Sequence, residues 1–158
     1  ESKINVVIHP QSIIHSMVEY NDGSFLAQLG SPDMRTPIAH SLSYPKRIES
    51  GSKPLDLFAL SALEFIEPDL QKFACLRLAR QAMQAGTQAT IVLNAANESA
   101  VSAFLEERVR LTDIATINEQ ALSQVSAPTL TADASIDDIL AIDEMTRRYV
   151  NTLIAQMV

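Results

Sequence analysis

The first part of the chain alternates between apolar and polar residues, as strands do. Residues 3–9 mix β-branched and polar side chains, and Pro10 interrupts this run because proline has no amide hydrogen to donate. Residues 13–20 and 24–29 flank Asn21-Asp22-Gly23, and Asp-Gly between two strand-like runs is typical of a tight hairpin. The pattern predicts a strand, a corner and a hairpin, with an unpaired sheet edge.

The pattern changes after Gly30. Asp33 can cap the amides of a short helix, in which Pro37 is tolerable only near the first turn. Residues 44–69 then carry prolines and a glycine without sustained periodicity, which predicts a linker that crosses a surface.

From about residue 70 onward, apolar residues recur at helical spacing. We expect helices over 70–85 and 89–107, a third that starts at the cap Thr112, and a fourth that starts with a cap of Ser135 and Asp138. The apolar positions expected to face their core are Phe73, Leu76, Ala79 and Met83; Val92, Leu93, Ala96, Ala100 and Phe104; Ile114, Ile117, Ala121, Leu122 and Val125; and Ile139, Leu140, Tyr149, Val150, Leu153, Ile154 and Met157. Four amphipathic helices with short connections favour a small bundle, so the predicted fold class is α+β: a few antiparallel strands, a linker and a four-helix bundle-like domain.

Composition narrows the classes of protein. The longest apolar stretch is too short to cross a bilayer, and the N-terminal residues do not resemble a secretion signal, so we expect no membrane partner. The single cysteine, Cys75, lies beside Leu76 and Leu78 in a helical pattern, where we expect a buried, inert thiol and a reducing, cytoplasmic location. A net charge of -7 without a basic stripe argues against nucleic acid as a partner.

Histidines are the first candidates for chemistry, because G-x-G-x-x-G, P-loop and H-E-x-x-H motifs are all missing from this sequence. His9 and His15 are six residues apart, but Pro10 lies between them, so a shared metal ion is the less favoured reading. His40 is most simply a partly buried, hydrogen-bonded histidine rather than a catalytic one.

Acidic and amide residues in the helical part are the other candidates. Asp137, Asp138, Asp143 and Glu144 could suggest a cation site, yet they lie at or near the start of the last helix, where the helix dipole favours negative charge. Asn94 and Asn97 are poor helix formers inside a predicted helix. Hydrogen bonds from these amides to the linker backbone are a more economical explanation than contact with a substrate.

Three segments together resemble one enzyme family. They are HPQSIIHSMVEYNDGSFLAQLGSPDMRTPIAHSL (9–42), GSKPLDLFALSALEF (51–65) and LNAANESAVSAFL (93–105). The chain resembles the C-terminal part of 1-deoxy-D-xylulose 5-phosphate reductoisomerase over nearly its whole length. The resemblance is specific because several unrelated residue types recur in order, as in HPQS-x-x-HSM and G-x-P-D-M-R.

The resemblance implies an activity and its cofactors. The family converts 1-deoxy-D-xylulose 5-phosphate to 2-C-methyl-D-erythritol 4-phosphate in the non-mevalonate route to isoprenoid precursors. It uses NADPH and a divalent cation, magnesium or manganese, and works as a homodimer. By this resemblance, residues 1–43 are the last part of the catalytic domain, 44–69 a linker and 70–158 a C-terminal helical bundle.

The resemblance also limits which site residues this chain can carry. It implies that Pro32 and Met34 lie against the nicotinamide and that His15 shapes the substrate pocket, whereas the metal ligands lie upstream of this sequence. We therefore expect the chain alone to be inactive, to bind neither cofactor, and to pair through strands 13–20 or 24–29. The alternative is a free-standing, non-enzymatic helical interaction module.

Overall fold

The computed structural model describes residues 3–131 and 133–157. Its elements run in the order β1 (Ile14–Glu19), β2 (Phe25–Leu29), α1 (Arg35–Ser43), α2 (Ala74–Ala85), α3 (Thr87–Leu105), α4 (Asp113–Gln124) and α5 (Ile136–Ala155). The predicted α+β class is confirmed. The chain divides into two compact units, which we call the hairpin unit (Asn5–Pro68) and the helical unit (Asp69 onward, together with Lys3 and Ile4). None of the described helices is long and apolar enough to span a membrane.

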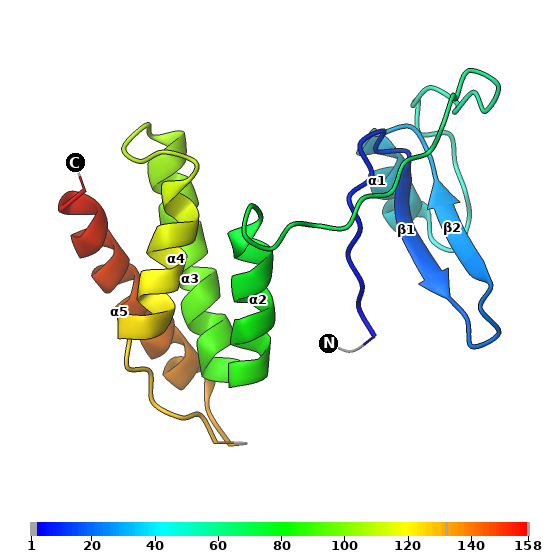
Figure 1. The fold of residues 1–158 in the computed structure, drawn as a ribbon. Helices are drawn as coiled ribbons and strands as arrows, with labels where there is room; N and C mark the ends of the chain where they lie inside the picture. The colour runs from blue at the N-terminus through cyan, green and yellow to red at the C-terminus, as the bar shows by residue number, and fades with distance from the viewer. Residues whose placement is uncertain (1–2, 132, 158) are drawn as a thin grey trace. The chain divides into compact units, whose positions relative to one another are not determined.

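In the hairpin unit, β1 and β2 form the predicted antiparallel hairpin (Figure 1). Gly23 has a φ of +82°, a conformation that glycine adopts without steric cost, and its amide donates to the Tyr20 carbonyl at 2.9 Å. The Asp22 carboxylate accepts hydrogen bonds from both the amide and the hydroxyl of Ser24. These contacts close the turn where the Asp-Gly signal predicts it.

The predicted strand over residues 3–9 is wrong. Within the described chain, only Ile8 of this run pairs, through two backbone hydrogen bonds of 2.9 Å with Ile66. Val6 and Val7 remain exposed, so β-branched residues alone did not produce a strand here. A strand needs a partner that continues beside it, and the facing segment supplies one residue.

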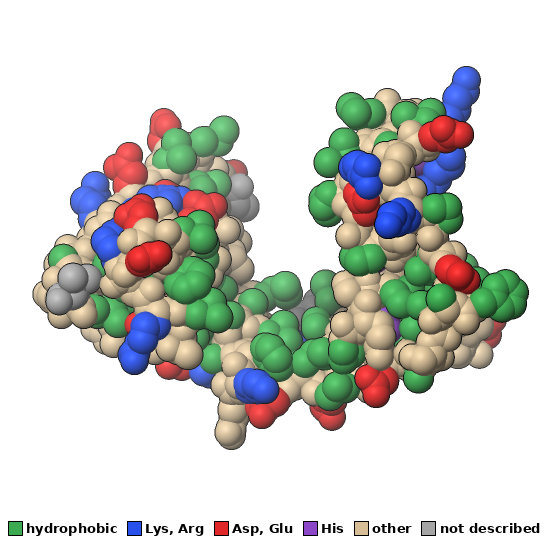
Figure 2. Space-filling model, turned by 90° about the horizontal axis from the view of Figure 1, so that it is seen from above, with side chains coloured by type: hydrophobic (Ala, Val, Ile, Leu, Met, Phe, Trp, Pro, Cys, Tyr) green, Lys and Arg blue, Asp and Glu red, His purple; other side chains and the backbone are tan. Residues whose placement is uncertain are grey.

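Little of the hairpin unit is buried. Ile13, which is 8% exposed, is the single described residue of this unit with a buried side chain. Large apolar side chains on both strands and in the segment after α1 remain exposed, among them Val18, Phe25, Leu26, Leu57 and Phe58. Hydrophobic side chains are accordingly widespread on the visible surface in Figure 2. This unit has almost no core of its own.

The helical unit has a continuous core. α3 packs against α2, α4 and α5, as the ribbon shows (Figure 1), and small side chains at Ala95, Ala96 and Ala100 let the helices approach closely. α5 begins at the predicted capping box, in which the Asp138 amide donates to the Ser135 hydroxyl and the Ser135 amide donates to the Asp138 carboxylate. The predicted four-helix arrangement is confirmed.

The predicted buried faces are largely correct for α3 and α4, where Leu93, Phe104, Leu122 and Val125 are half-buried rather than buried, and wrong in part for the outer helices. In α2 the buried residues are Leu78 and Ala82, whereas Phe73, Ala79 and Met83 are exposed and Leu76 is half-buried. In α5 they are Ile142, Thr146, Val150 and Ile154, so Ile139, Leu140 and Met157 were assigned wrongly. Both helices carry more apolar positions than one face holds, and the neighbouring helices decide which face packs.

The start of α4 also differs from the prediction. The Thr112 side chain makes no capping hydrogen bond. The Asp113 carboxylate instead accepts from the Arg110 amide at 2.8 Å and pairs with the Arg110 guanidinium. A carboxylate in the first turn is favoured by the positive end of the helix dipole.

Candidate functional site

The candidate site is the segment that leaves β2 and enters α1, residues 31–34. Its start is fixed by the Gly30 amide, which donates to the Ile13 carbonyl at 3.0 Å. Pro32 is exposed and Met34 is 71% exposed. Within the hairpin unit, the segment therefore presents two largely exposed apolar side chains.

Asp33 and Arg35 form a clamp at the start of α1. The Asp33 carboxylate accepts from the Arg35 amide at 2.9 Å and from two nitrogens of its guanidinium, the shorter contact being 2.6 Å. These hydrogen bonds with Arg35 lower the pKa of Asp33 from 3.8 to about 2. As predicted, Asp33 accepts a hydrogen bond from an amide at the start of α1, but among the backbone amides of the described residues it bonds that of Arg35 alone, and the N-cap residue itself is Met34, which makes no side-chain cap.

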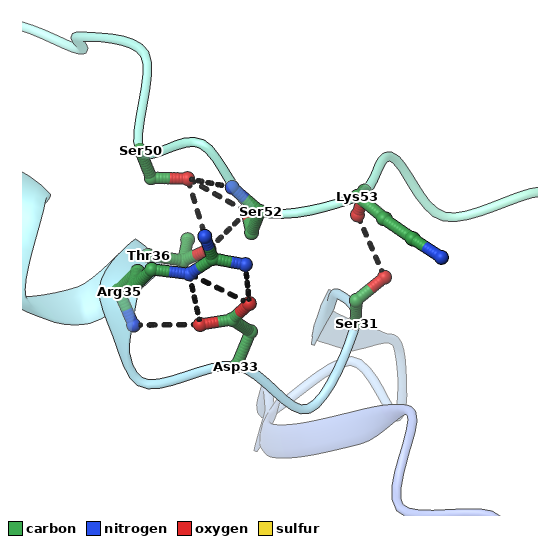
Figure 3. A network of polar contacts seen from close by, with 7 residues as sticks. All are labelled: Ser31, Asp33, Arg35, Thr36, Ser50, Ser52 and Lys53. Atoms are coloured by element: carbon green, nitrogen blue, oxygen red, sulfur yellow. Dashed lines mark hydrogen bonds and ion pairs between the residues drawn. The ribbon is translucent and has the colours of Figure 1, made fainter.

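A chain of hydroxyl groups joins α1 to the segment 50–53. The Thr36 hydroxyl lies 2.8 Å from the Ser52 hydroxyl, which lies 2.6 Å from the Ser50 hydroxyl. Close by, the Ser31 hydroxyl donates to the Lys53 carbonyl at 2.8 Å, and the Lys53 amine points away from the network (Figure 3). Residues far apart in sequence therefore meet on both sides of Pro32 and Met34.

His15 lies at an irregularity in the hairpin. β1 and β2 pair at Ile14 with Leu29 and at Ser16 with Gln28, so His15 is the extra residue of a β-bulge. A Cβ atom added to Gly30 would lie 4.0 Å from the imidazole Nε2. The exposed His15 ring is thus beside the residue that precedes the Ser31–Met34 segment.

His9 serves different neighbours. Its Nδ1 lies 2.8 Å from the Glu64 carbonyl oxygen, and its ring stacks on Phe65 with centroids 5.1 Å apart. Its Nε2 is buried and has no hydrogen-bond partner within the described residues. His9 was predicted only as a possible half of a metal pair with His15, because the neighbours that bury its Nε2 are distant in sequence.

His40 was expected to be hydrogen-bonded, and this prediction is wrong for the described structure. Its Nδ1 is buried without a hydrogen-bond partner among the described residues. The half-buried ring instead meets Tyr44 edge to face, with centroids 5.8 Å apart. Tyr44 follows the last turn of α1, so the ring contact closes the end of the helix.

The predictions for Cys75 and for the two asparagines of α3 also differ from the structure. Cys75 is exposed rather than buried, although it lies on the same face of α2 as Leu78 and Ala82 and its Sγ accepts from the Asn118 amide at 4.0 Å. The predicted hydrogen bonds from the asparagines to the linker are wrong: Asn97 accepts from the buried Asn118 amide at 3.1 Å, and Asn94 donates to Glu98. Asn97 does make a structural hydrogen bond, but its partner is Asn118 on α4 instead of the linker backbone.

Three of the four acidic candidates in α5 have structural partners, and Asp137 lies in the first turn of the helix. Asp138 belongs to the capping box, Asp143 pairs with Arg147 at 2.6 Å, and Glu144 pairs with Arg148 at 3.5 Å. Arg147 also reaches Glu98 on α3 at 2.5 Å. Over residues 3–131 and 133–157, no group of three or more His, Cys, Asp or Glu side chains could hold a metal ion.

The hairpin, its polar-anchored loop and the bundle define a two-unit α+β protein with its candidate site in the smaller unit. Residues 29–149 match the family described as the DXP reductoisomerase C-terminal domain, and the chain belongs to this family.

Close relatives agree with this assignment. The chain is 76% identical over 157 residues to the 1-deoxy-D-xylulose 5-phosphate reductoisomerase of Psychrobacter arcticus and 54% identical over 158 residues to that of Proteus mirabilis. These two matches span 99% and 100% of this chain, respectively, but only 39% of the length of each relative. A crystal structure of DOX-P reductoisomerase in complex with NADPH, fosmidomycin and magnesium superposes with a TM-score of 0.88 at 52% identity, covering 96% of this chain and 39% of that one.

Proposed function

We propose that this chain forms the C-terminal section of an NADPH-dependent reductoisomerase that converts 1-deoxy-D-xylulose 5-phosphate to 2-C-methyl-D-erythritol 4-phosphate. The relatives that support this reading are matched along the whole of this chain and over 39% of their own length. The activity is therefore proposed for the whole enzyme. The observation that carries the proposal is the fixed loop that presents Pro32 and Met34 to solvent.

The proposal divides the chain by role. Residues 1–43 complete the catalytic domain, residues 44–69 link it to the next part, and residues 70–158 form a helical bundle. The continuous apolar core of the bundle supports a structural role, together with the Ser135–Asp138 capping box and the Arg147–Glu98 ion pair that joins α5 to α3.

Pro32 and Met34 are proposed to lie against the nicotinamide ring. Their exposed, uncharged side chains fit this role, since apolar contacts can orient a planar ring without competing for its polar groups. The cofactor supplies the hydride, while this chain limits how the ring can lie. His15, beside Gly30, is proposed to shape the edge of the substrate pocket.

The described residues do not fit a metal site, because no group of carboxylates, imidazoles or thiols converges in them. The magnesium or manganese ion of the proposed reaction would be held by residues outside the described part of this chain. For the same reason we propose that this chain alone has no turnover.

The proposal includes a homodimer that pairs through β1 or β2. The exposed apolar side chains of Val18, Phe25 and Leu26 support it, because a second copy would cover them. The single cysteine supports a cytoplasmic location, where thiols stay reduced.

The proposal is tested by a Met34→Ala variant of the full-length enzyme, with NADPH oxidation followed by absorbance. We expect kcat/KM for NADPH to fall about tenfold, since one apolar side chain buried against a ligand contributes about 1.5 kcal/mol. Met83→Ala, which removes an equally large side chain that is 50% exposed on α2, is the matched control and should leave kcat/KM unchanged. Equal values for both variants and the parent enzyme would contradict the proposed contact.

A further inference from the structure

Residues 50–53, which we call the strap, lie against the candidate site from another part of the sequence. The strap engages α1 through the hydroxyls of Ser50 and Ser52, which meet Thr36 at 3.4 Å and 2.8 Å (Figure 3). It engages the start of the loop through the Lys53 carbonyl, which accepts from Ser31. These contacts are fourteen or more residues apart in sequence and flank the presented segment on both sides.

Burial of apolar side chains does not hold residues 31–34 in place. Pro32 and Met34 are exposed, and Ile13 alone among the described side chains of this unit is buried. The Asp33–Arg35 clamp is local, joining residues two positions apart. The position of the loop relative to the rest of the unit therefore depends on the Gly30–Ile13 backbone bond and on the strap.

The strap has the backbone that this arrangement requires. Gly51 has a φ of +73°, a backbone conformation that residues other than glycine rarely adopt. The turn at Gly51 brings the hydroxyls of Ser50 and Ser52 within 2.6 Å of each other, and the Ser52 amide also donates to the Ser50 hydroxyl. Thr36, Ser50 and Ser52 are all half-buried, so water competes less for these bonds than at a fully exposed site.

We propose that the strap is a positioning element: through Thr36 and Ser31 it fixes the orientation of Pro32 and Met34, and thereby the affinity of the full-length enzyme for NADPH. This inference rests on the proposed function, in which those two side chains contact the nicotinamide. It assigns a role in cofactor binding to residues of the linker, which do not touch the cofactor themselves.

The test compares variants of the full-length enzyme in three measurements: NADPH dissociation constant, amide hydrogen exchange over residues 31–36, and thermal midpoint. Thr36→Val keeps the shape of the side chain but removes its hydroxyl, and Ser52→Ala breaks the same chain from the other side. Thr36→Ser keeps the hydroxyl that Thr36→Val removes. Ser61→Ala removes an exposed linker hydroxyl that has no hydrogen-bond partner among the described residues and serves as the control.

We expect Thr36→Val and Ser52→Ala each to raise the NADPH dissociation constant about three- to tenfold and to accelerate exchange in the loop. The thermal midpoint and the KM for the sugar phosphate should stay unchanged, and Thr36→Ser should recover most of the affinity. A merely structural role would lower the thermal midpoint and leave NADPH affinity intact in the folded enzyme.

Met34→Ala distinguishes the proposed contact of Met34 with the nicotinamide from the proposed role of the strap. If Met34→Ala weakens NADPH binding while Thr36→Val and Ser52→Ala do not, the strap inference is overturned and the proposed contact stands. If Met34→Ala itself leaves NADPH affinity unchanged, the proposed function of the loop is overturned and the strap inference with it. Unchanged exchange over residues 31–36 in both hydroxyl variants also overturns the inference.

Discussion

The two units of this chain are stabilised in different ways. The helical unit buries a continuous apolar core in which Ile117, Val150 and Ile154 are fully covered. The hairpin unit buries Ile13 and leaves apolar side chains on both strands exposed, so its described contacts are mainly backbone pairs and polar side-chain bonds. Apolar burial is the dominant favourable contribution to folding, whereas exposed hydrogen bonds add little net stability. We therefore expect the helical unit to be the more stable of the two. The hairpin unit should become more stable when another surface covers its exposed apolar side chains.

Hydrogen exchange of this 158-residue chain is the broadest test of that contrast. We expect the amides of α3 to exchange at least about 100-fold more slowly than those of β1, because opening a helix in a packed core costs more free energy than opening a two-stranded hairpin. Rates are corrected for the intrinsic exchange of each amide. Equal protection of α3 and β1 would break the comparison.

A single truncation in the bundle should have the next largest effect. Ile142 is 1% exposed in α5, and Ile142→Ala should reduce the free energy of unfolding by about 2–5 kcal/mol through lost burial and a cavity. Leu140→Ala, two residues away at 52% exposure, should change it by less than about 0.5 kcal/mol. Urea unfolding followed by circular dichroism measures both. Equal losses would mean that the core assignment of α5 is wrong.

A capping variant should have a smaller effect in the same unit. Ser135→Ala removes the hydroxyl that accepts from the Asp138 amide and should cost about 1 kcal/mol in urea unfolding. Thr112→Ala is the matched control, since the Thr112 side chain makes no capping hydrogen bond, and it should have little effect. A larger loss for Thr112→Ala would contradict the observed caps.

Titration of Asp33 should give the smallest and most local effect, and it concerns the polar contacts of the hairpin unit. Its folded-state pKa is depressed, so the favourable interaction with Arg35 is present above the ordinary value of 3.8 and is lost as the pH falls through about 2. Carboxyl carbon NMR should show this low pKa, and Arg35→Met should move it towards 3.8.

Asp22 is the internal control for that titration. Its pKa is lowered by hydrogen bonds from the Ser24 hydroxyl and amide, so Arg35→Met should leave it unchanged. An Asp33 that titrates at its ordinary pKa in the unmodified protein would show that the clamp does not form.

Local rules predicted local features well. The Asp-Gly turn, the Ser135–Asp138 capping box and the role of Asp33 at the start of α1 each depend on residues a few positions apart, and each is found where it was expected. The resemblance gave the family, and it named Pro32, Met34 and His15 as site residues. Their proposed roles stay predictions for the experiments above.

Features that depend on distant residues were missed. No rule links Thr36 to Ser50 and Ser52, so the strap was invisible in the sequence. Asn97 was assigned to the linker because its true partner, Asn118, lies on another helix. The β-bulge at His15 follows from how the two strands pair, which alternation along one strand does not encode.

The sequence by itself determined where helices and turns form and to which family the chain belongs, because helical period, caps and ordered motifs are written in neighbouring residues. The tertiary structure decided which apolar face of α2 and α5 is buried, why Cys75 is exposed, and that the segment 3–9 is not a strand. The physical reason is that burial and strand pairing depend on what lies opposite a residue in space. The loop at Pro32 and Met34 is held by the strap through Ser31 and Thr36, and by the proposal its exposed side chains lie opposite the cofactor.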